Sequence, residues 1–327
     1  MLISRPNCIK SLTNFILSDY KYLNVYNNIG RPRPFDVTLR DGLQALSKEE
    51  QINFTTKEKI EVYNKLIKYH CPKNIEIGSF VSNKILPIFN DTDKLLKCVN
   101  NEYVYKGVIN NFVLVPNLPY LQKALYNGAN NFSFITSASN QFQMKNTRMT
   151  IEQNEDNILS MLQFLDHLSN LKYDSDTGDI WKDYSQYNVK LYVSCINECP
   201  VKDEKIDNIS IANTLSRLSN LKVNKLCLSD TCGTLTPEDF VNILRKSKQF
   251  GADIEKFSLH LHVKPDREHI VQDLVYIALD NGINEFDVSN FVTGGCSVTI
   301  DKNKLAPNMS YEQYYKFLSN YIISRSQ

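Results

Sequence analysis

The sequence contains no run of about 18 apolar residues, the length that a membrane-spanning helix needs. Its N-terminus also lacks the long apolar segment of a secretory signal peptide. The first two dozen residues contain Arg5, Lys10 and Lys21 but also Asp19, so they match a mitochondrial transit peptide only in part. We therefore expect a cytoplasmic protein, with a mitochondrial location as the alternative.

An excess of charge of either sign is absent as well. The chain has 37 Lys and Arg residues against 36 Asp and Glu residues, and its formal net charge is +1 at pH 7. This balance excludes a global basic field of the kind that attracts nucleic acid. Among the 8 cysteines, the pairs Cys195/Cys199 and Cys227/Cys232 lack the two-residue gap of a zinc knuckle. We expect reduced thiols rather than a disulfide framework or a metal cluster.

Short apolar runs alternate with longer amphipathic ones along the 327 residues, which is typical of βα units and a parallel sheet. Thr55–Tyr69 begins with a capping box, Thr150–Leu171 carries apolar residues at helical spacing, and Thr236 followed by a proline starts another helix. About eight such units close a barrel, so the sequence predicts an α/β fold, a (β/α)₈ TIM barrel. The expected strands are Phe35–Leu39, Asn74–Gly78, Phe112–Val115, Asn131–Thr136, Val189–Ser194, Lys225–Ser229, Phe257–His262 and Glu285–Val288.

Two segments fall outside this alternation. Residues 1–34 form an N-terminal extension that ends in alternating arginines and prolines, and residues 35–327 form the expected catalytic barrel. Tyr173–Tyr187 is polar and rich in turn residues, so we expect a surface insertion there. Its acidic residues match the ligand pattern of a calcium loop only incompletely. No internal repeat or second domain is visible in the sequence.

Polar residues follow several of the expected strands, where the active site of a TIM barrel lies. Arg40 and Asp41 come directly after the first strand, and Asp41 is a hard oxygen ligand while Arg40 can hold an oxyanion. A surface ion pair is the alternative interpretation. Glu76 lies between two apolar residues of the second strand, so alternation turns it towards the barrel interior. A carboxylate buried there needs a partner, and Arg40 or a cation would serve.

The seventh expected strand ends in Leu259-His260-Leu261-His262. Residues two apart on a strand face the same side, so His260 and His262 can point at one metal ion. Two structural histidines are the alternative. Asp230 follows the sixth strand and is either a proton relay or a turn aspartate. Cys296 follows two glycines after the eighth strand, and it is either an acid or nucleophile on a mobile loop or an inert buried thiol.

Taken in order, these segments resemble the DRE-TIM metallolyase superfamily and, within it, the 3-hydroxy-3-methylglutaryl-CoA (HMG-CoA) lyases. The resemblance extends from about residue 35 to the C-terminus. It rests on Arg40-Asp41-Gly42-Leu43-Gln44, Ile75-Glu76-Ile77-Gly78-Ser79-Phe80-Val81-Ser82, Val115-Pro116-Asn117-Leu118, Tyr192-Val193-Ser194-Cys195, Ser229-Asp230-Thr231-Cys232-Gly233, His260-Leu261-His262, Gly294-Gly295-Cys296 and Asn308 followed by Glu312.

The resemblance implies a role for each of the matching residues. Asp41, His260, His262 and Asn308 would bind a divalent cation, Mg²⁺ or Mn²⁺. Arg40 would stabilise an enolate oxygen and, with Gln44, bind the substrate. Glu76 would support Arg40 and the metal shell. Asp230 would assist proton transfer, and Cys296 would be the acid at the departing acetyl-CoA carbon.

The implied activity is the cleavage of HMG-CoA, or a related 3-hydroxyacyl-CoA, to acetyl-CoA and acetoacetate, as in leucine degradation. The resemblance also implies an acyl-CoA substrate and a homodimer. The alternatives are a Claisen-condensing synthase of the isopropylmalate, citramalate or homocitrate type, and a barrel that binds metal or acyl-CoA without turnover. The chain departs from the family after His262, where Val263 removes an expected hydrogen-bond partner of the metal shell, and after Cys296, where the glycine-rich loop is replaced.

Overall fold

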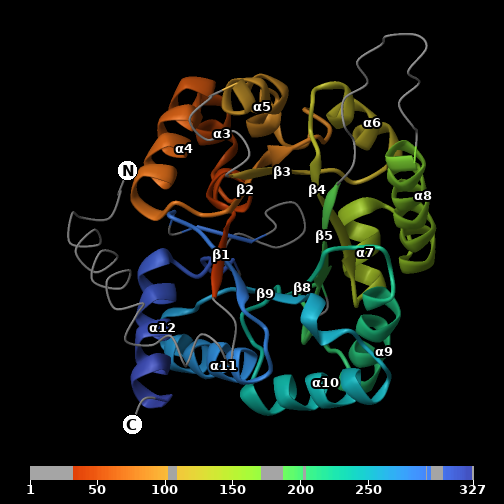
Figure 1. The fold of residues 1–327 in the computed structure, drawn as a ribbon, viewed down its shortest axis with the longest axis vertical. Coiled ribbons are helices and arrows are strands. Elements are labelled where there is room, and N and C mark those ends of the chain that lie inside the picture. Colours follow the sequence, from red (N-terminus) through yellow and green to blue (C-terminus); the bar gives the residue numbers. More distant parts are fainter. Residues whose placement is uncertain are drawn as a thin grey trace.

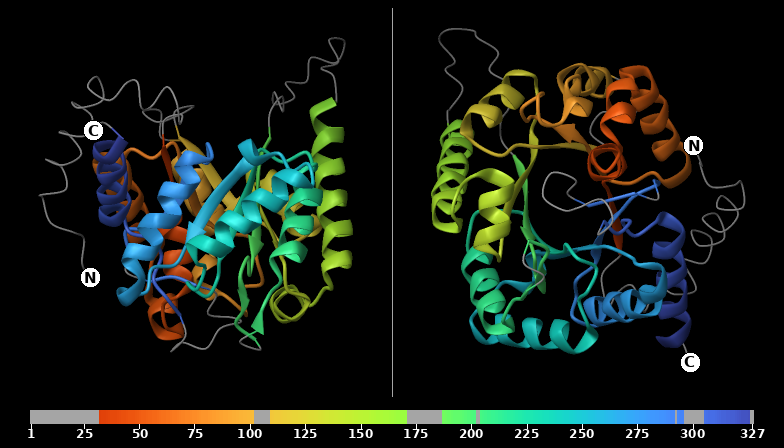
Figure 2. Two further views of the ribbon diagram at one scale, coloured as in Figure 1. Left: turned by 90° about the horizontal axis from the view of Figure 1, so that it is seen from below. Right: turned by 180° about the vertical axis from the view of Figure 1, so that it is seen from behind.

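A computed structural model describes residues 32–101, 109–170, 187–201, 204–291, 293–295 and 305–325. Eight parallel strands close into a barrel in the order β1-β10-β9-β8-β5-β4-β3-β2, and helices surround it (Figures 1 and 2). The structure therefore confirms the predicted (β/α)₈ TIM barrel. The barrel strands are β1 (Arg33–Asp36), β2 (Asn74–Ser79), β3 (Asn110–Leu114), β4 (Asn131–Ser137), β5 (Asn188–Ser194), β8 (Lys225–Asp230), β9 (Phe257–Leu261) and β10 (Glu285–Val288).

The helices form the outer layer of the molecule, and α4 (Thr56–His70) lies beside α12 (Tyr311–Arg325) where the ring closes (Figure 2). A short antiparallel ribbon, β6 (Glu198–Cys199) with β7 (Glu204–Lys205), lies in the connection after β5. The α-helices are α3 (Lys48–Asn53), α4 (Thr56–His70), α5 (Thr92–Asn101), α6 (Leu118–Tyr126), α7 (Asn140–Thr147), α8 (Ile151–Asn170), α9 (Asn208–Ser219), α10 (Pro237–Gln249), α11 (Glu268–Asp280) and α12 (Tyr311–Arg325).

The helix starts that the sequence predicts are confirmed. Thr55 caps α4 in a capping box with Glu58, because each side chain binds the backbone N–H of the other residue. Thr236 caps α10, and its side chain accepts a hydrogen bond from the N–H of Asp239. Among the described residues, none of the helices combines the length and the apolar composition that a membrane span requires.

The prediction of a first strand over Phe35–Leu39 is wrong at its C-terminal end. The strand ends at Asp36, whose carboxylate accepts hydrogen bonds from the backbone N–H of Thr38 (2.9 Å) and from its hydroxyl (3.0 Å). This local turn takes the backbone out of the ladder. A π-helical turn, Thr38–Gly42, follows, and the N–H of Gly42 bonds to the carbonyl of Val37 (3.1 Å). The extra winding places Arg40 and Asp41 on a buried turn at the barrel mouth.

The seventh barrel strand is one residue shorter than predicted. β9 ends at Leu261, and His262 instead forms an isolated antiparallel bridge with Asn308. The bridge joins the end of β9 to the segment that precedes α12, so two parts of the sequence meet at the mouth. The N-terminal extension up to residue 31 and residues 173–186 of the predicted insertion lie outside the described residues.

Candidate metal centre

Three buried side chains with metal-binding atoms meet at the mouth of the barrel. Asp41 comes from the π-helical turn after β1, and His260 and His262 come from the end of β9. Their ligand atoms all lie within 4.8 Å of one another. The two histidine Nε2 atoms are 3.2 Å apart, and Nε2 of His260 is 4.0 Å from Oδ2 of Asp41. The shared facing of the two imidazoles, which strand alternation predicts, is thus confirmed.

Asn308 brings a fourth candidate ligand, a second oxygen atom, to this cluster. Nδ2 of Asn308 donates a hydrogen bond to Oδ2 of Asp41 (2.9 Å), and the Asn308 side chain is buried. The side-chain oxygen Oδ1 of Asn308 is buried and accepts no hydrogen bond from any residue that the structure describes. An amide oxygen left without a donor in a buried site costs free energy, and a cation would satisfy it.

Hydrogen bonds to the far side of each ring determine which nitrogen faces the cluster. Nδ1 of His262 lies 2.7 Å from the backbone carbonyl of Ala306, which can only accept, so Nδ1 carries the proton. Nδ1 of His260 lies 3.0 Å from Oδ2 of Asp287, another acceptor. Both Nε2 atoms therefore turn their lone pairs into the cluster. Bonds of this kind from the second ring nitrogen are typical of metal-binding histidines.

Two lone pairs 3.2 Å apart repel each other, and a cation bound by both would remove this repulsion. Burial, together with the neighbouring His260, lowers the pKa of His262 to about 4, so its ring is neutral at pH 7. Two ligands bound at a right angle to one ion, at roughly 2.1 Å each, would be separated by about 3 Å. The donor set and its spacing therefore fit a divalent cation.

The carboxylate of Asp41 is ionised at neutral pH. Burial by itself would raise the pKa of Asp41, but the adjacent guanidinium of Arg40, together with the two histidines and the N–H of Gly295, outweighs burial and holds this pKa well below its usual value. Oδ1 of Asp41 accepts a hydrogen bond from Nη1 of Arg40 (2.6 Å), while the N–H of Gly295 donates to Oδ2 (3.0 Å). A fixed, charged carboxylate is the form that binds a hard cation.

Arg40 is held in the barrel mouth by three neighbours. Its Nε donates to the carboxylate of Glu76, its Nη1 donates to Asp41, and its guanidinium lies 5.2 Å from the centre of the Tyr192 ring. The residue exposure is 7% for Arg40 and 4% for Asp41, so the interpretation as a surface ion pair is wrong. Glu76 is fully buried, which confirms its predicted inward orientation.

A cavity of about 450 Å³ opens over this cluster. Arg40, Gln44, Tyr192 and Gly295 line it beside the three candidate ligands. Its outer part is formed by the end of α7 and the turn after it, including Lys145 and Arg148. The cavity is large enough for a small organic molecule to reach the cluster.

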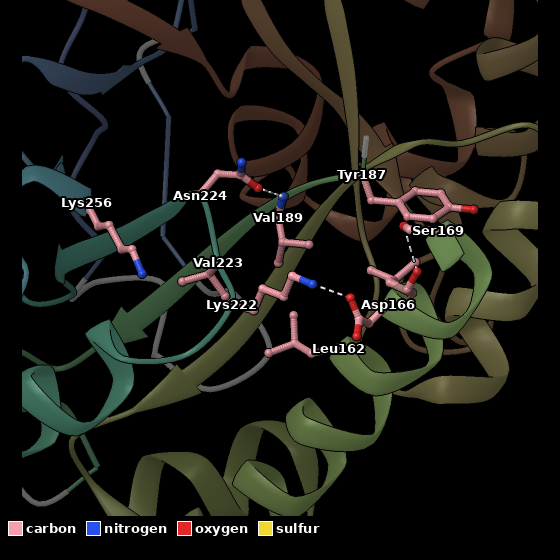
Figure 3. A pocket seen from close by; sticks show the side chains of 10 residues that line it. Leu162, Asp166, Ser169, Tyr187, Val189, Lys222, Val223, Asn224 and Lys256 are labelled. Atoms are coloured by element: carbon pink, nitrogen blue, oxygen red, sulfur yellow. Dashed lines mark hydrogen bonds and ion pairs between the residues drawn. The ribbon is translucent and has the colours of Figure 1, made fainter. Parts of the chain in front are cut away.

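A second cavity, of about 340 Å³, lies at the opposite end of the barrel, where β5 and β8 begin (Figure 3). Lys222 pairs there with Asp166, and the side-chain oxygen of Asn224 accepts a hydrogen bond from the N–H of Val189 (2.7 Å). Among the residues that the structure describes, no further group of His, Cys, Asp and Glu is arranged to hold a metal ion. Of these two cavities, the one at the mouth therefore combines space with metal-binding chemistry.

The predicted site residue Asp230 binds the backbone of its own turn and does not face the mouth cavity. The carboxylate of Asp230 accepts hydrogen bonds from the backbone N–H groups of Thr234 (3.1 Å) and Leu235 (3.0 Å), and Asp230 does not line the cavity. Burial raises the pKa of Asp230 to about 6. This geometry is that of a turn aspartate, which was the alternative interpretation. Cys296 lies outside the described residues.

Sequence reasoning did not single out Tyr192 and Asp287. The hydroxyl of Tyr192 donates to Oδ2 of Asp287 (2.9 Å), and Asp287 in turn contacts His260. Asp287 lies between the apolar residues Phe286 and Val288 in β10, so strand alternation predicts an inward orientation for it, as it does for Glu76. Val263 is also less disruptive than expected, because the carbonyl of Ala306 supplies a partner for His262.

The barrel and the cluster at its mouth define the class of protein, a TIM barrel with a candidate Asp/His metal site at the C-terminal ends of its strands. The chain belongs to the HMGL-like family, whose family model matches residues 31–314. This match confirms the resemblance to the HMG-CoA lyases.

Known proteins of this kind are similar over most of the chain. Hydroxymethylglutaryl-CoA lyase YngG of Bacillus subtilis is 29% identical over 272 residues, which cover 81% of this chain and 80% of the relative. The mitochondrial hydroxymethylglutaryl-CoA lyase of Arabidopsis thaliana is 28% identical over 261 residues, but these cover 80% of this chain and only 49% of that protein. The chain thus spans about half the length of the Arabidopsis relative.

The fold is also that of solved structures. An HMG-CoA lyase from Acinetobacter baumannii, in complex with coenzyme A and 3-methylmalate, superposes with a TM-score of 0.71 at 22% identity. The superposition covers 89% of this chain and 84% of that one. At 22% identity, this structural similarity shows that the two chains share a fold.

Proposed function

We propose that the protein is a divalent-metal-dependent carbon–carbon lyase that cleaves HMG-CoA, or a closely related 3-hydroxyacyl-CoA, to acetyl-CoA and acetoacetate. The observation that carries this proposal is the convergence of Asp41, His260 and His262 in a buried cluster beside Arg40. Membership of the HMGL-like family supports the same reaction class.

Asp41, His260, His262 and Asn308 would hold the cation, for which we propose Mg²⁺ or Mn²⁺. Two oxygen donors and two imidazoles suit these ions, and Mn²⁺ accepts nitrogen ligands more readily than Mg²⁺. A divalent cation held there would polarise oxygen atoms of the substrate and ease the loss of its hydroxyl proton.

Side chains of the protein would stabilise the negative charge that develops during cleavage. As the bond between C2 and C3 of the acyl group breaks, its electron pair passes to the acetyl-CoA fragment and forms an enolate. The Arg40 guanidinium, fixed by Glu76, would stabilise the enolate oxygen without moving. Gln44 lines the same cavity and would bind the substrate. Cys296 would return a proton to the acetyl-CoA carbon, the role that the family resemblance gives it.

The outer part of the cavity supports an acyl-CoA substrate. Lys145 and Arg148 lie at its rim, and the phosphates of a coenzyme A tail are negatively charged. The Acinetobacter lyase holds coenzyme A in a barrel of the same fold. A homodimer and a cytoplasmic location remain further proposals, and the matching relatives include proteins named as cytoplasmic and as mitochondrial.

The direct test supplies purified protein with HMG-CoA and either Mg²⁺ or Mn²⁺ and measures acetoacetate and acetyl-CoA. We expect both products in equal amounts from the wild type and neither from Asp41→Asn, which keeps the volume of the side chain. Absence of acetoacetate from a protein that binds Mn²⁺ would overturn the substrate assignment. Release of free coenzyme A from acetyl-CoA and a 2-keto acid would then identify a synthase, and binding without any turnover would identify a non-catalytic barrel.

A further inference from the structure

Hydrogen bonds between buried side chains connect one histidine of the candidate metal centre, through an aspartate, to a lysine in the barrel interior. We propose that Asp287 is a positioning residue that fixes the tautomer of His260, and that Lys190 acts through Asp287 by holding its carboxylate in place. This inference rests on the proposed function, because it concerns the same cation.

Three donors from two strands, β5 and β9, lie within 3.0 Å of the carboxylate of Asp287. Oδ1 lies 2.5 Å from the ammonium of Lys190 on β5. Oδ2 accepts a hydrogen bond from the hydroxyl of Tyr192 (2.9 Å) and lies 3.0 Å from Nδ1 of His260 on β9. Asp287 is 1% exposed, so water does not compete for these contacts. A carboxylate bound in this way has one orientation and always presents Oδ2 to the imidazole.

Lys190 is itself 1% exposed, which is rare for a lysine. Its ammonium also lies 3.3 Å from Oε1 of Glu285 and 3.5 Å from the centre of the Phe35 ring. An unpaired ammonium in this interior would be strongly unfavourable, and the carboxylate of Asp287 is the nearer of its two partners on β10. In turn, the ammonium of Lys190 binds Oδ1 of Asp287 and so holds this carboxylate in one orientation.

The acceptor at Nδ1 of His260 determines which of its two ring nitrogens carries the proton. With an ionised acceptor at Nδ1, the ring is protonated there and its Nε2 lone pair faces Asp41 and His262. If Nδ1 lacked an acceptor, the proton would move to Nε2 and enter the cluster, where it would compete with the cation. Asp287 would therefore increase metal affinity without touching the metal.

Asp287→Asn tests this directly, because an amide has one accepting and one donating end. Lys190 can only donate, so it would attract the amide oxygen, and the amide N–H₂ would then face Nδ1 of His260. A donor at Nδ1 favours the tautomer with the proton on Nε2. The matched control is Glu285→Gln, which alters a carboxylate on the same strand beside the same lysine but has no contact with His260 among the described residues.

The first measurement is the ¹⁵N NMR spectrum of the histidine side chains in the metal-free protein, with His260 assigned by its loss in His260→Gln. We expect an unprotonated Nε2 in the wild type and in Glu285→Gln, and a protonated Nε2 in Asp287→Asn. An unchanged tautomer in Asp287→Asn would overturn the proposal. This arm needs neither metal nor substrate, so its outcome is independent of whether the proposed activity is found.

The second measurement is the dissociation constant of Mn²⁺ by titration calorimetry. We expect it to rise about 10- to 100-fold in Asp287→Asn, to stay at the wild-type value in Glu285→Gln, and to recover in Asp287→Glu. Equal weakening in Asp287→Asn and Glu285→Gln would show a general effect of the buried charges and would overturn the proposal. If Asp287→Asn does not fold, Lys190→Gln replaces it in both measurements. We then expect a smaller shift of the His260 tautomer and a smaller rise of the Mn²⁺ dissociation constant, in the same direction. Wild-type values of both in Lys190→Gln would overturn the proposal.

Discussion

At the scale of single residues, Arg40 shows how burial changes what a common side chain can do. An arginine beside an aspartate on a surface contributes little, because water screens both charges. In this barrel the guanidinium is buried, and two of its donors are taken by Glu76 and Asp41. Its orientation is therefore set before a substrate arrives, which is the condition for electrostatic stabilisation of a developing charge.

We expect Arg40→Lys to lower kcat for HMG-CoA about 100- to 1000-fold while the Mn²⁺ dissociation constant stays unchanged. Lysine keeps the positive charge beside Asp41 but lacks the planar fork that reaches Glu76 and the substrate together. Steady-state kinetics and Mn²⁺ titration on the same preparation separate the two effects. A loss of metal affinity as large as the loss of kcat would place Arg40 in the metal shell instead.

At the scale of elements, the loop after β10 brings Asn308 to the cluster through a close approach to glycine. A Cβ atom built on Gly294 would lie 2.7 Å from the backbone nitrogen and from the side-chain Cγ of Asn308. Only a residue without a side chain allows these two segments to meet. The approach positions the oxygen donor that is otherwise without a partner.

We expect Gly294→Ala to displace Asn308 and to weaken Mn²⁺ binding by about tenfold or more. Thermal unfolding in the presence of a chelator is the control, because it reports the cost of the clash without any metal. Wild-type Mn²⁺ affinity in a folded Gly294→Ala variant would contradict a ligand role for Asn308.

A second prediction at this scale concerns the contact of α4 with α12. The ring of His70 stacks on Tyr311 with centroids 3.7 Å apart, and its buried Nδ1 has no hydrogen-bond partner among the described residues. Burial lowers the pKa of His70 to about 4 from the ordinary 6.5. As the pH falls from 6.5 to 4, the unfolded chain takes up a proton that the folded protein resists, so the folded state loses stability.

We expect His70→Phe to retain the stacking and to remove this acid sensitivity, so that its stability relative to wild type rises by about 1–3 kcal/mol between pH 7 and pH 4.5. Urea unfolding at the two pH values measures the difference. His269→Phe is the control, since His269 is exposed on α11. The same gain at both pH values would contradict the titration of His70 as the cause.

At the scale of the whole molecule, the barrel interior carries more negative than positive charge. Asp41, Glu76, Glu285 and Asp287 are buried there with two cations, Arg40 and Lys190. The hydroxyl of Tyr192 contacts both Glu76 (3.4 Å) and Asp287 (2.9 Å) and so joins the two ion-pair groups. Two more positive charges, those of one divalent cation, would balance this network.

We therefore expect Mn²⁺ to stabilise the whole barrel. At a free concentration of 100 times the dissociation constant, binding to the folded state alone adds about 2.7 kcal/mol and raises Tm by roughly 4 °C. Differential scanning calorimetry with and without a chelator measures the shift. Asp41→Asn, which removes one ligand charge, should lose most of it, and an equal shift in this variant would mean that Mn²⁺ binds elsewhere.

The sequence by itself determined those features that depend on local periodicity. The alternation of apolar residues placed the barrel strands to within a few residues, and the spacing of His260 and His262 placed both rings on one side. Thr55 and Thr236 marked two helix starts through their caps. Each of these depends on residues close in the chain, and backbone geometry fixes what such residues can do.

The closure of the barrel decided the rest. Asp41 and Asn308 are 267 positions apart, and no local pattern says that they touch. The same holds for the contact of Asp287 with His260 and for the carbonyl of Ala306 beneath His262. Asp230 shows the reverse case, in which a residue of the right type at a strand end binds the amides of its own turn. Whether a polar side chain faces the cavity or its own backbone depends on packing around the whole mouth, which short-range spacing does not encode.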